Sequence, residues 1–216
     1  MITDFSIQLD VEKELRWDPA VGADHVAVTV KNGAVTLIGD VESYWERTAA
    51  ARAAWRVAHV QAVTNLLRVD LPFASERPDD DIALAAMSIL EWNCAVPSTV
   101  EVQVAAGVLT LTGAASHLYQ KEEAERALCA LHGLKSLKNE IRLEPVSAAS
   151  DARPGIEEAL RRSALVDSSH LKVQASHGVV NLRGTAKSKA EHDAALQAAW
   201  SAPGVTQVDD HIAIGV

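Results

Sequence analysis

The sequence predicts an α+β fold of three tandem small units, each with its elements in the order α-β-β-α-β. The first observation is a segment with two glycines six residues apart, which occurs at residues 31–39, 105–113 and 176–184. The second is a pair of residues twenty positions after the second glycine of each copy. The pair is His59-Val60, Gly133-Leu134 or Gly204-Val205. Spacings that hold without a gap in three copies indicate an internal repeat, here with a period of about seventy residues.

Each repeated segment is predicted to be a two-stranded hairpin. Asn32-Gly33 lies between two β-rich runs, and this pair favours a type I′ turn because that turn needs positive φ at both central residues. The turn places Val30 opposite Val35 and Val28 opposite Leu37, so one face of the hairpin is apolar. The same register pairs Val104 with Leu109 and Val102 with Leu111 in the second copy, and Ala175 with Val180 and Val173 with Leu182 in the third.

The repeated glycines are expected to have structural roles only. Gly33, Gly107 and Gly178 occupy the turns. The second set falls on the buried face of the hairpin, where the missing side chain would let a helix approach closely. These second glycines are Gly39, Gly113 and Gly184. No Gly-Lys-Ser/Thr follows either set, so the spacing does not indicate a phosphate-binding loop.

Helix signals flank every hairpin. In the first unit Thr3 or Asp4 caps a helix that ends near Trp17, before Asp18-Pro19. Ser43 and Glu46 have the spacing of a capping box for a second helix, and a third strand is expected from about residue 63 to residue 71. The third unit repeats the box at Ser188 and Glu191, whereas the middle unit has His117 and Gln120 there.

These signals place the units at residues 1–71, 79–145 and 152–216. The first linker, residues 71–78, has a proline near each end, and the second, residues 144–154, is rich in alanine and serine. A unit of this size buries roughly 60% of its unfolded surface and is marginally stable alone, so contact between units is expected.

The combined pattern resembles the BON domain. Its residues are V-x-N-G-x-V-x-L-x-G at the first hairpin and, twenty residues on, a motif that reads G-V-x-x-V-x-N-x-L in that family. This chain departs from the motif at His59, Leu134 and Asp210. The resemblance implies two helices packed on one face of a three-stranded mixed sheet in each unit. The family is named from osmotically inducible periplasmic proteins and nodulation-related proteins. The resemblance therefore also implies binding to phospholipid surfaces or protection against envelope or osmotic stress, as its members are thought to do.

The charge distribution restricts the partners. The net charge of −9 divides into −3 over residues 1–78, −5 over 79–150 and −1 over 151–216. No unit is basic, so nucleic acid is excluded as a partner and an anionic membrane is disfavoured. The first ten residues lack a basic region and a long apolar run, so we expect a cytoplasmic protein.

No motif indicates catalysis, a cofactor or a metal. The eight histidines form no pair at metal-ligand spacing, and we expect them at the surface. No G-x-S-x-G or activated thiol context accompanies the serines and cysteines. Cys94 and Cys129 are interpreted as small, partly buried side chains rather than a disulfide.

The tryptophans are the most informative side chains for interactions. Trp17 and Trp92, at the end of the first helix in two units, are expected to plug the core. Trp55 and Trp200 are equivalent positions of the second helix and lie one step off its inward stripe. Ala51 and Leu196 precede them by one turn and extend a second apolar stripe. This stripe fits either the core or an interface between units or chains.

Together these observations predict a non-enzymatic binding or interaction protein associated with stress response. Its expected partner is another protein or a second copy of the chain. A peripheral phospholipid-binding protein is the first alternative, and an enzyme or metal protein with an unrecognised site is the second.

Overall fold

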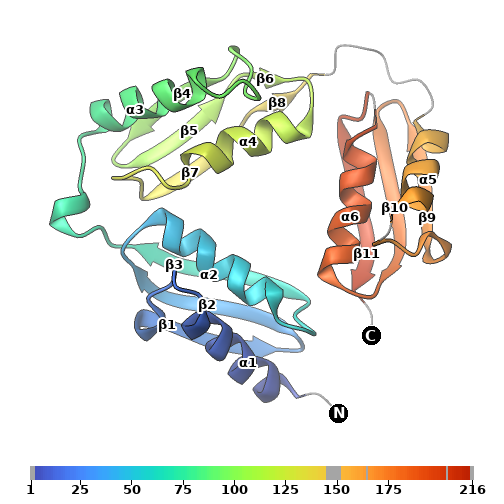
Figure 1. Ribbon diagram of the computed structural model, residues 1–216, viewed down its shortest axis with the longest axis horizontal. Coiled ribbons are helices and arrows are strands. Elements are labelled where there is room, and N and C mark those ends of the chain that lie inside the picture. Colours follow the sequence, from blue (N-terminus) through green and yellow to red (C-terminus); the bar gives the residue numbers. More distant parts are fainter. Residues whose placement is uncertain (1–2, 145–151, 164, 203, 215–216) are drawn as a thin grey trace. The chain divides into compact units, whose positions relative to one another are not determined.

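A computed structural model describes residues 3–144, 152–163, 165–202 and 204–214 (Figure 1). The first repeat consists of helix α1 (Asp4–Trp17), strands β1 (Val26–Lys31) and β2 (Ala34–Val41), helix α2 (Tyr44–Arg56) and strand β3 (Ala62–Val69). Short 3-10 turns precede β1 (η1, Ala23–His25) and follow β3 (η2, Phe73–Ser75).

The other two repeats follow the same order. The second contains α3 (Asp79–Glu91), β4 (Glu101–Ala105), β5 (Val108–Thr112), β6 (Ala114–Ala115), α4 (Leu118–Leu128), β7 (Ser136–Asn139) and β8 (Arg142–Leu143). The third contains α5 (Arg153–Arg162), η3 (Ser168–His170), β9 (Leu171–Ser176), β10 (Val179–Ala186), α6 (Lys189–Trp200) and β11 (Gln207–Ile214). The predicted α+β class and element order are confirmed.

Each repeat has a mixed sheet with its second strand in the centre. In the first repeat β1 pairs antiparallel with β2, and β2 pairs parallel with β3. The predicted hairpin registers are observed in all three repeats, including Val28 opposite Leu37, Val102 opposite Leu111 and Val173 opposite Leu182. A two-residue turn therefore sets which side chains face the core.

The middle repeat interrupts its central and third strands. After Gly113 the central strand continues as β6, which pairs in parallel with β8, while β5 pairs with β7. The strand order of the other repeats is preserved, but the central and third strands are each divided into two short strands.

The helix caps lie at the predicted positions, but the glutamate of the first capping box bonds to other residues than expected. The side chains of Thr3, Ser43 and Ser188 accept hydrogen bonds from the backbone at the third residue after each cap. Glu46, however, does not return a bond to Ser43. Its two carboxylate oxygens accept from Glu42 N at 2.9 Å and from Gly22 N at 2.6 Å, which joins the loop before β1 to the start of α2.

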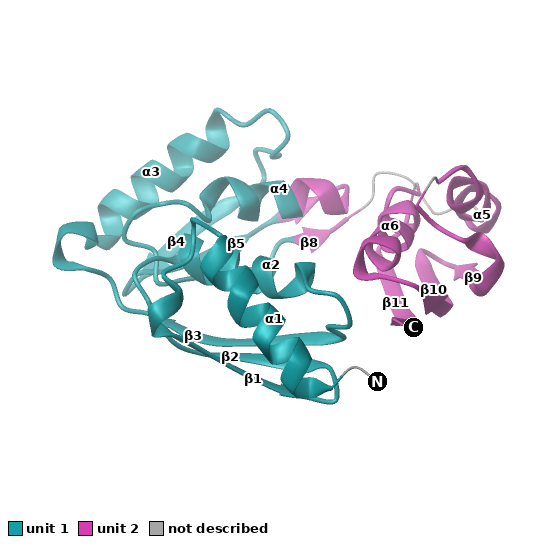
Figure 2. Ribbon diagram, turned by 60° about the horizontal axis from the view of Figure 1, so that its bottom comes forward, with its two compact units in different colours: residues 1–113, 122–141 teal, residues 114–121, 142–216 magenta. Residues whose placement is uncertain are grey.

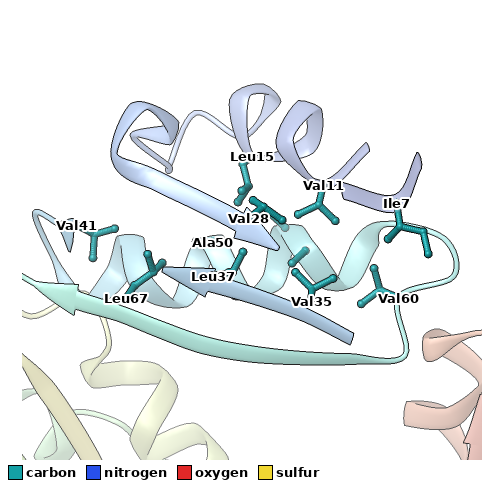
Figure 3. Packing of buried hydrophobic residues seen from close by; sticks show 12 residues of the cluster. Ile7, Val11, Leu15, Val28, Val35, Leu37, Val41, Ala50, Val60 and Leu67 are labelled. Atoms are coloured by element: carbon teal, nitrogen blue, oxygen red, sulfur yellow. The ribbon is translucent and has the colours of Figure 1, made fainter. Parts of the chain in front are cut away.

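The core of the first repeat lies between its sheet and its two helices (Figure 3). Val11 and Leu15 on α1 face Val28 on β1, and Val35 and Leu37 on β2 are completely buried. The alanines of α2 that line this core allow the helix to approach the sheet closely; they are Ala50, Ala53 and Ala54. An equivalent cluster fills the third repeat, built around Ile156, Leu160 and Leu182.

Trp17 and Trp92 are not core residues, contrary to the prediction. Their side chains are 84% and 87% exposed. The reason is the geometry of an α-helix, in which each residue turns by about 100°. Each tryptophan follows the last buried leucine of its helix, Leu15 or Leu90, by two residues, and therefore lies on the opposite side.

The chain divides into two compact units, residues 1–113 with 122–141 and residues 114–121 with 142–216 (Figure 2). The first unit holds the first repeat and most of the second. The second unit holds the third repeat together with β6, the start of α4 and β8 of the second repeat. Among the described residues, none of the helices has both the length and the apolar character required to cross a membrane.

Candidate interaction surfaces

The turn residues have the backbone conformation that the sequence predicts. φ is positive at both central residues of all three hairpin turns: 51° and 74° at Asn32-Gly33, 53° and 76° at Ala106-Gly107, and 51° and 82° at His177-Gly178. These turns are therefore structural features.

A carboxylate holds two of these turns in place, and the sequence analysis did not find it. Asp4, in the first turn of α1, accepts hydrogen bonds from Asn32 N at 2.8 Å and Gly33 N at 3.0 Å. Asp79 does the same for Ala106 N and Gly107 N, at 2.7 and 2.9 Å. Asp4 was expected at most to cap its helix, whereas Asp4 and Asp79 each tie their helix to its hairpin.

The second glycines do not make room for a helix, so that prediction is wrong. A Cβ on Gly39 would stand 1.9 Å from the backbone oxygen of His25, the residue before β1. Gly113 and Gly184 meet Thr99 O and His170 O in the same way, at 2.1 and 2.0 Å. All three have φ between 108° and 143°. The close approach comes from the chain that leads into the first strand.

The candidate interface stripe on α2 and α6 is half-buried in both repeats. Trp55 packs against the core cluster of the first repeat, and Trp200 and Leu196 pack against that of the third. Ala51 has the same intermediate exposure. The four residues therefore combine packing within their own repeat with some remaining surface, and their role as an interface stays a prediction.

A different apolar surface lies on the first helix of the first two repeats. We define the helix-one stripe as six outward residues: Phe5, Leu9 and Trp17 on α1, and Leu84, Met87 and Trp92 on α3. All are large hydrophobic side chains that the structure leaves exposed. The signal was present in the sequence, since Phe5 and Leu9 are four residues apart and therefore neighbours on one side of the helix, away from buried Ile7 and Val11.

The third repeat holds its second helix to its last strand by a titratable pair. In the first repeat the guanidinium of Arg47 donates to Leu67 O at 2.9 Å, and the Asn65 amide donates to Arg47 O at 2.8 Å. In the third repeat the equivalent residues are His192 and Asp210, and His192 Nε2 lies 2.8 Å from an Asp210 oxygen. His192 is buried, so the expectation that all histidines lie at the surface is wrong for this one.

Glu191 is a buried carboxylate with two backbone partners. It accepts from Asp167 N at 2.8 Å and from Lys187 N at 2.6 Å, as Glu46 does in the first repeat. These bonds hold the pKa of the Glu191 carboxyl below its ordinary value. Gln120 is the uncharged counterpart in the middle repeat, and its side-chain oxygen accepts from Ser116 N and His117 N.

The two cysteines do not form a disulfide: Cys94 is exposed, Cys129 is buried, and both thiols are free. Burial raises the pKa of the Cys129 thiol, which opposes its use as a nucleophile. Within the described ranges, no three His, Cys, Asp or Glu side chains gather in a way that could hold a metal ion.

Comparison with known proteins accounts for this set of features. The family model of the BON domain matches residues 3–70, 78–145 and 150–215, which together make up nearly the whole chain. The chain belongs to the BON domain family. BON domains are non-catalytic domains of binding type, and this chain carries three of them in tandem.

A search of curated proteins found no match. Among solved structures, one similar chain is CdsD, a structural protein of the type III secretion system of Chlamydia trachomatis, with 17% identity. The match covers 94% of this chain and 90% of that one, with a TM-score of 0.28. A second is the C-terminal domain of CdsD, also 17% identical, with 100% of both chains covered and a TM-score of 0.27.

Proposed function

We propose that this BON protein is a non-enzymatic protein-interaction module, associated with stress response, whose first two repeats bind a partner protein through the helix-one stripe. The observation that carries the proposal is the exposure of Trp17 and Trp92 on the outer faces of α1 and α3. Large exposed aromatic side chains are typical of protein interfaces, where burial of an indole contributes strongly to affinity.

The charges beside the stripe favour a protein over an anionic lipid surface. Helix α3 begins with Asp79, Asp80 and Asp81 and contains no lysine or arginine. Attraction to an anionic membrane depends on basic residues, at roughly 1 kcal/mol for each one near the surface. Acidic residues at one end of an apolar helix face are complementary to a partner surface that is neutral or basic there.

A phospholipid surface is the second candidate, because exposed tryptophan and phenylalanine also suit the interface between membrane and water. Phe73, in η2, is 92% exposed and adds to the aromatic surface. Flotation with phosphatidylglycerol vesicles near physiological salt separates the two candidates. The protein-interaction proposal expects little or no co-flotation, and salt-sensitive co-flotation lost with Trp17→Ala and Trp92→Ala would replace it by the lipid function.

Photo-cross-linking tests the proposal directly. A photoreactive amino acid in place of Leu84, on the stripe, should give a discrete cross-link to a protein or to a second copy of the chain. The matched control replaces Gln103, which is exposed on β4 of the same repeat and lies off the stripe. Equal cross-linking from both positions, or none from Leu84, would contradict the proposal.

A further inference from the structure

A groove in the third repeat is independent of the helix-one stripe. It has a volume of about 410 Å³ and lies between α5 and β9. Leu160, Leu171 and Val173 supply apolar side chains to it. Its charged side chains are one acid, Glu157, and three cations, Arg153, Arg161 and Lys172. The groove therefore combines an apolar surface with a positively charged rim.

One wall of this groove is the edge of a β-sheet. The strand order is β11-β10-β9, so β9 has a neighbouring strand on one side only within the described part of the chain. Ser176 and Val179 close the two-residue turn, and hydrogen-bonded pairs alternate from there. Val173 and Ala175 consequently direct their N–H and C=O groups away from β10, toward the free edge.

Cations at both rim positions are specific to the third repeat. Buried Leu15, Leu90 and Leu160 are equivalent in the three first helices, so the residue after each can be compared. That residue is Arg16 in the first repeat, Glu91 in the second and Arg161 in the third.

The rim position on the first strand separates the third repeat from both of the others. The position that holds Lys172 in the third repeat is Ala27 in the first and Glu101 in the second. Lys172 is exposed, and the ion pair of Arg161 with Glu158 is exposed as well. Exposed pairs of this kind contribute little and exchange readily for another carboxylate.

We infer that β9 binds an extended segment of a partner protein, with alternating apolar and acidic side chains, by adding it as a fourth strand to the sheet. Main-chain hydrogen bonds to Val173 and Ala175 would supply affinity, and alternate side chains would supply specificity. The apolar side chains would face the groove beneath α5, and the acidic ones would lie on the open face beside Lys172. This inference rests on the proposed role as a protein-interaction module but uses another surface of another repeat.

The probe is a fluorescent peptide of alternating glutamate and valine, titrated against the full chain by fluorescence anisotropy. Saturable binding is expected. The double variant Arg161→Glu with Lys172→Glu should weaken it by about ten-fold or more, because two attractions become repulsions. Arg162→Glu is the matched control: it makes the same change on the same helix but does not line the groove, and should weaken binding by less than about three-fold.

A second probe tests strand addition on the unaltered protein. The same peptide with N-methyl groups on alternate residues keeps its charge and side chains but loses edge hydrogen bonds, and it should not bind. Absence of saturable binding, equal binding of the methylated peptide, or equal weakening by Arg162→Glu would each overturn the inference. The cross-linking result at Leu84 is independent of all three outcomes, so failure of either proposal can be told from failure of the other.

Discussion

At the scale of single residues, positive φ angles show where the repeat imposes a conformation on side chains that do not favour it. The first hairpin turn uses Asn32, which tolerates the left-handed region, whereas the equivalent Ala106 adopts φ 53° without a side chain that compensates. His59 likewise adopts φ 68° where the second and third repeats have Gly133 and Gly204. Both positions therefore carry backbone strain, and comparing the three repeats in the sequence is enough to find them.

Ala106→Asn is therefore expected to stabilise the middle repeat by about 0.5–1 kcal/mol, because asparagine adopts this conformation at lower cost than alanine. The midpoint of unfolding of that repeat should rise by roughly 3–6 °C for a domain of this size. Hydrogen exchange at the amides of β4 and β5 assigns the change to the correct repeat. Ala105→Asn, one residue earlier in the extended strand, is the control, and an equal or larger gain there would refute the explanation.

At the scale of the elements, much could be predicted because the signals are local. The turn pair Asn32-Gly33 specifies the register, and Thr3, Ser43 and Ser188 specify where helices begin. What could not be predicted depends on contacts distant in sequence. Glu46 bonds Gly22, and the second glycines meet the chain before the first strand, both through folding that no local period reveals.

The orientation of the helix-one stripe was available from the sequence but was misread. Counting turns from Leu15 and Leu90 places Trp17 and Trp92 opposite the core. Comparison of the copies could also have shown that His192 and Asp210 replace Arg47 and Asn65 together, which indicates a contact between them. Neither feature required knowledge of the whole fold.

Glu191 makes the third repeat sensitive to acid. Its folded pKa is depressed, so its contribution to stability is present above the ordinary carboxyl value of 4.5 and is lost as the pH falls through the lower folded value. Glu191→Gln removes the charge and one backbone acceptor. At neutral pH it should cost about 1–2 kcal/mol, the contribution of a hydrogen bond to a charged group.

As the pH falls from 4.5 through the lower folded value, the difference between wild type and Glu191→Gln should shrink, because the wild-type carboxyl becomes protonated in the folded state as well. Thermal melts from pH 7 to pH 3 measure this convergence. Glu157→Gln, which removes an exposed charge paired with Arg153, is the control and should change the midpoint little at any pH. A constant difference across the range would show that Glu191 acts through packing and not through its charge.

At the scale of the whole molecule, three copies of one scaffold carry different surfaces. The first two repeats expose the helix-one stripe, whereas the third has Pro154 in place of Leu9 and Leu84 and a cationic groove edge. The core positions vary far less, since each must fill the same space between two helices and a sheet. Repetition therefore supplies stability, and the divergence of exposed positions supplies separate binding surfaces.

The half-buried tryptophans of the second helices lead to the last prediction, which concerns assembly. Trp55 and Trp200 recur in the outer repeats, each one turn after the apolar residue Ala51 or Leu196, while the middle repeat has Cys129 at the equivalent place. We expect these stripes to contact each other within one chain or between copies. Burial of apolar area contributes roughly 25 cal/mol per Å², so two indoles could add several kcal/mol before ordering costs are subtracted.

Light scattering after size exclusion, together with thermal melts, tests this on Trp55→Ala and Trp200→Ala. A lower mass than the wild type would show that the stripe joins copies of the chain. Lower stability at unchanged mass would place the contact within one chain or within each repeat. Hydrogen exchange in both outer repeats distinguishes these two cases. Only a contact between repeats would lower the protection of the unaltered repeat as well as that of the altered one. Phe73→Ala, which removes an exposed aromatic ring from η2, is the control for a general loss of surface apolarity. If both tryptophan variants keep the wild-type mass and midpoint, the tryptophans are not interface anchors.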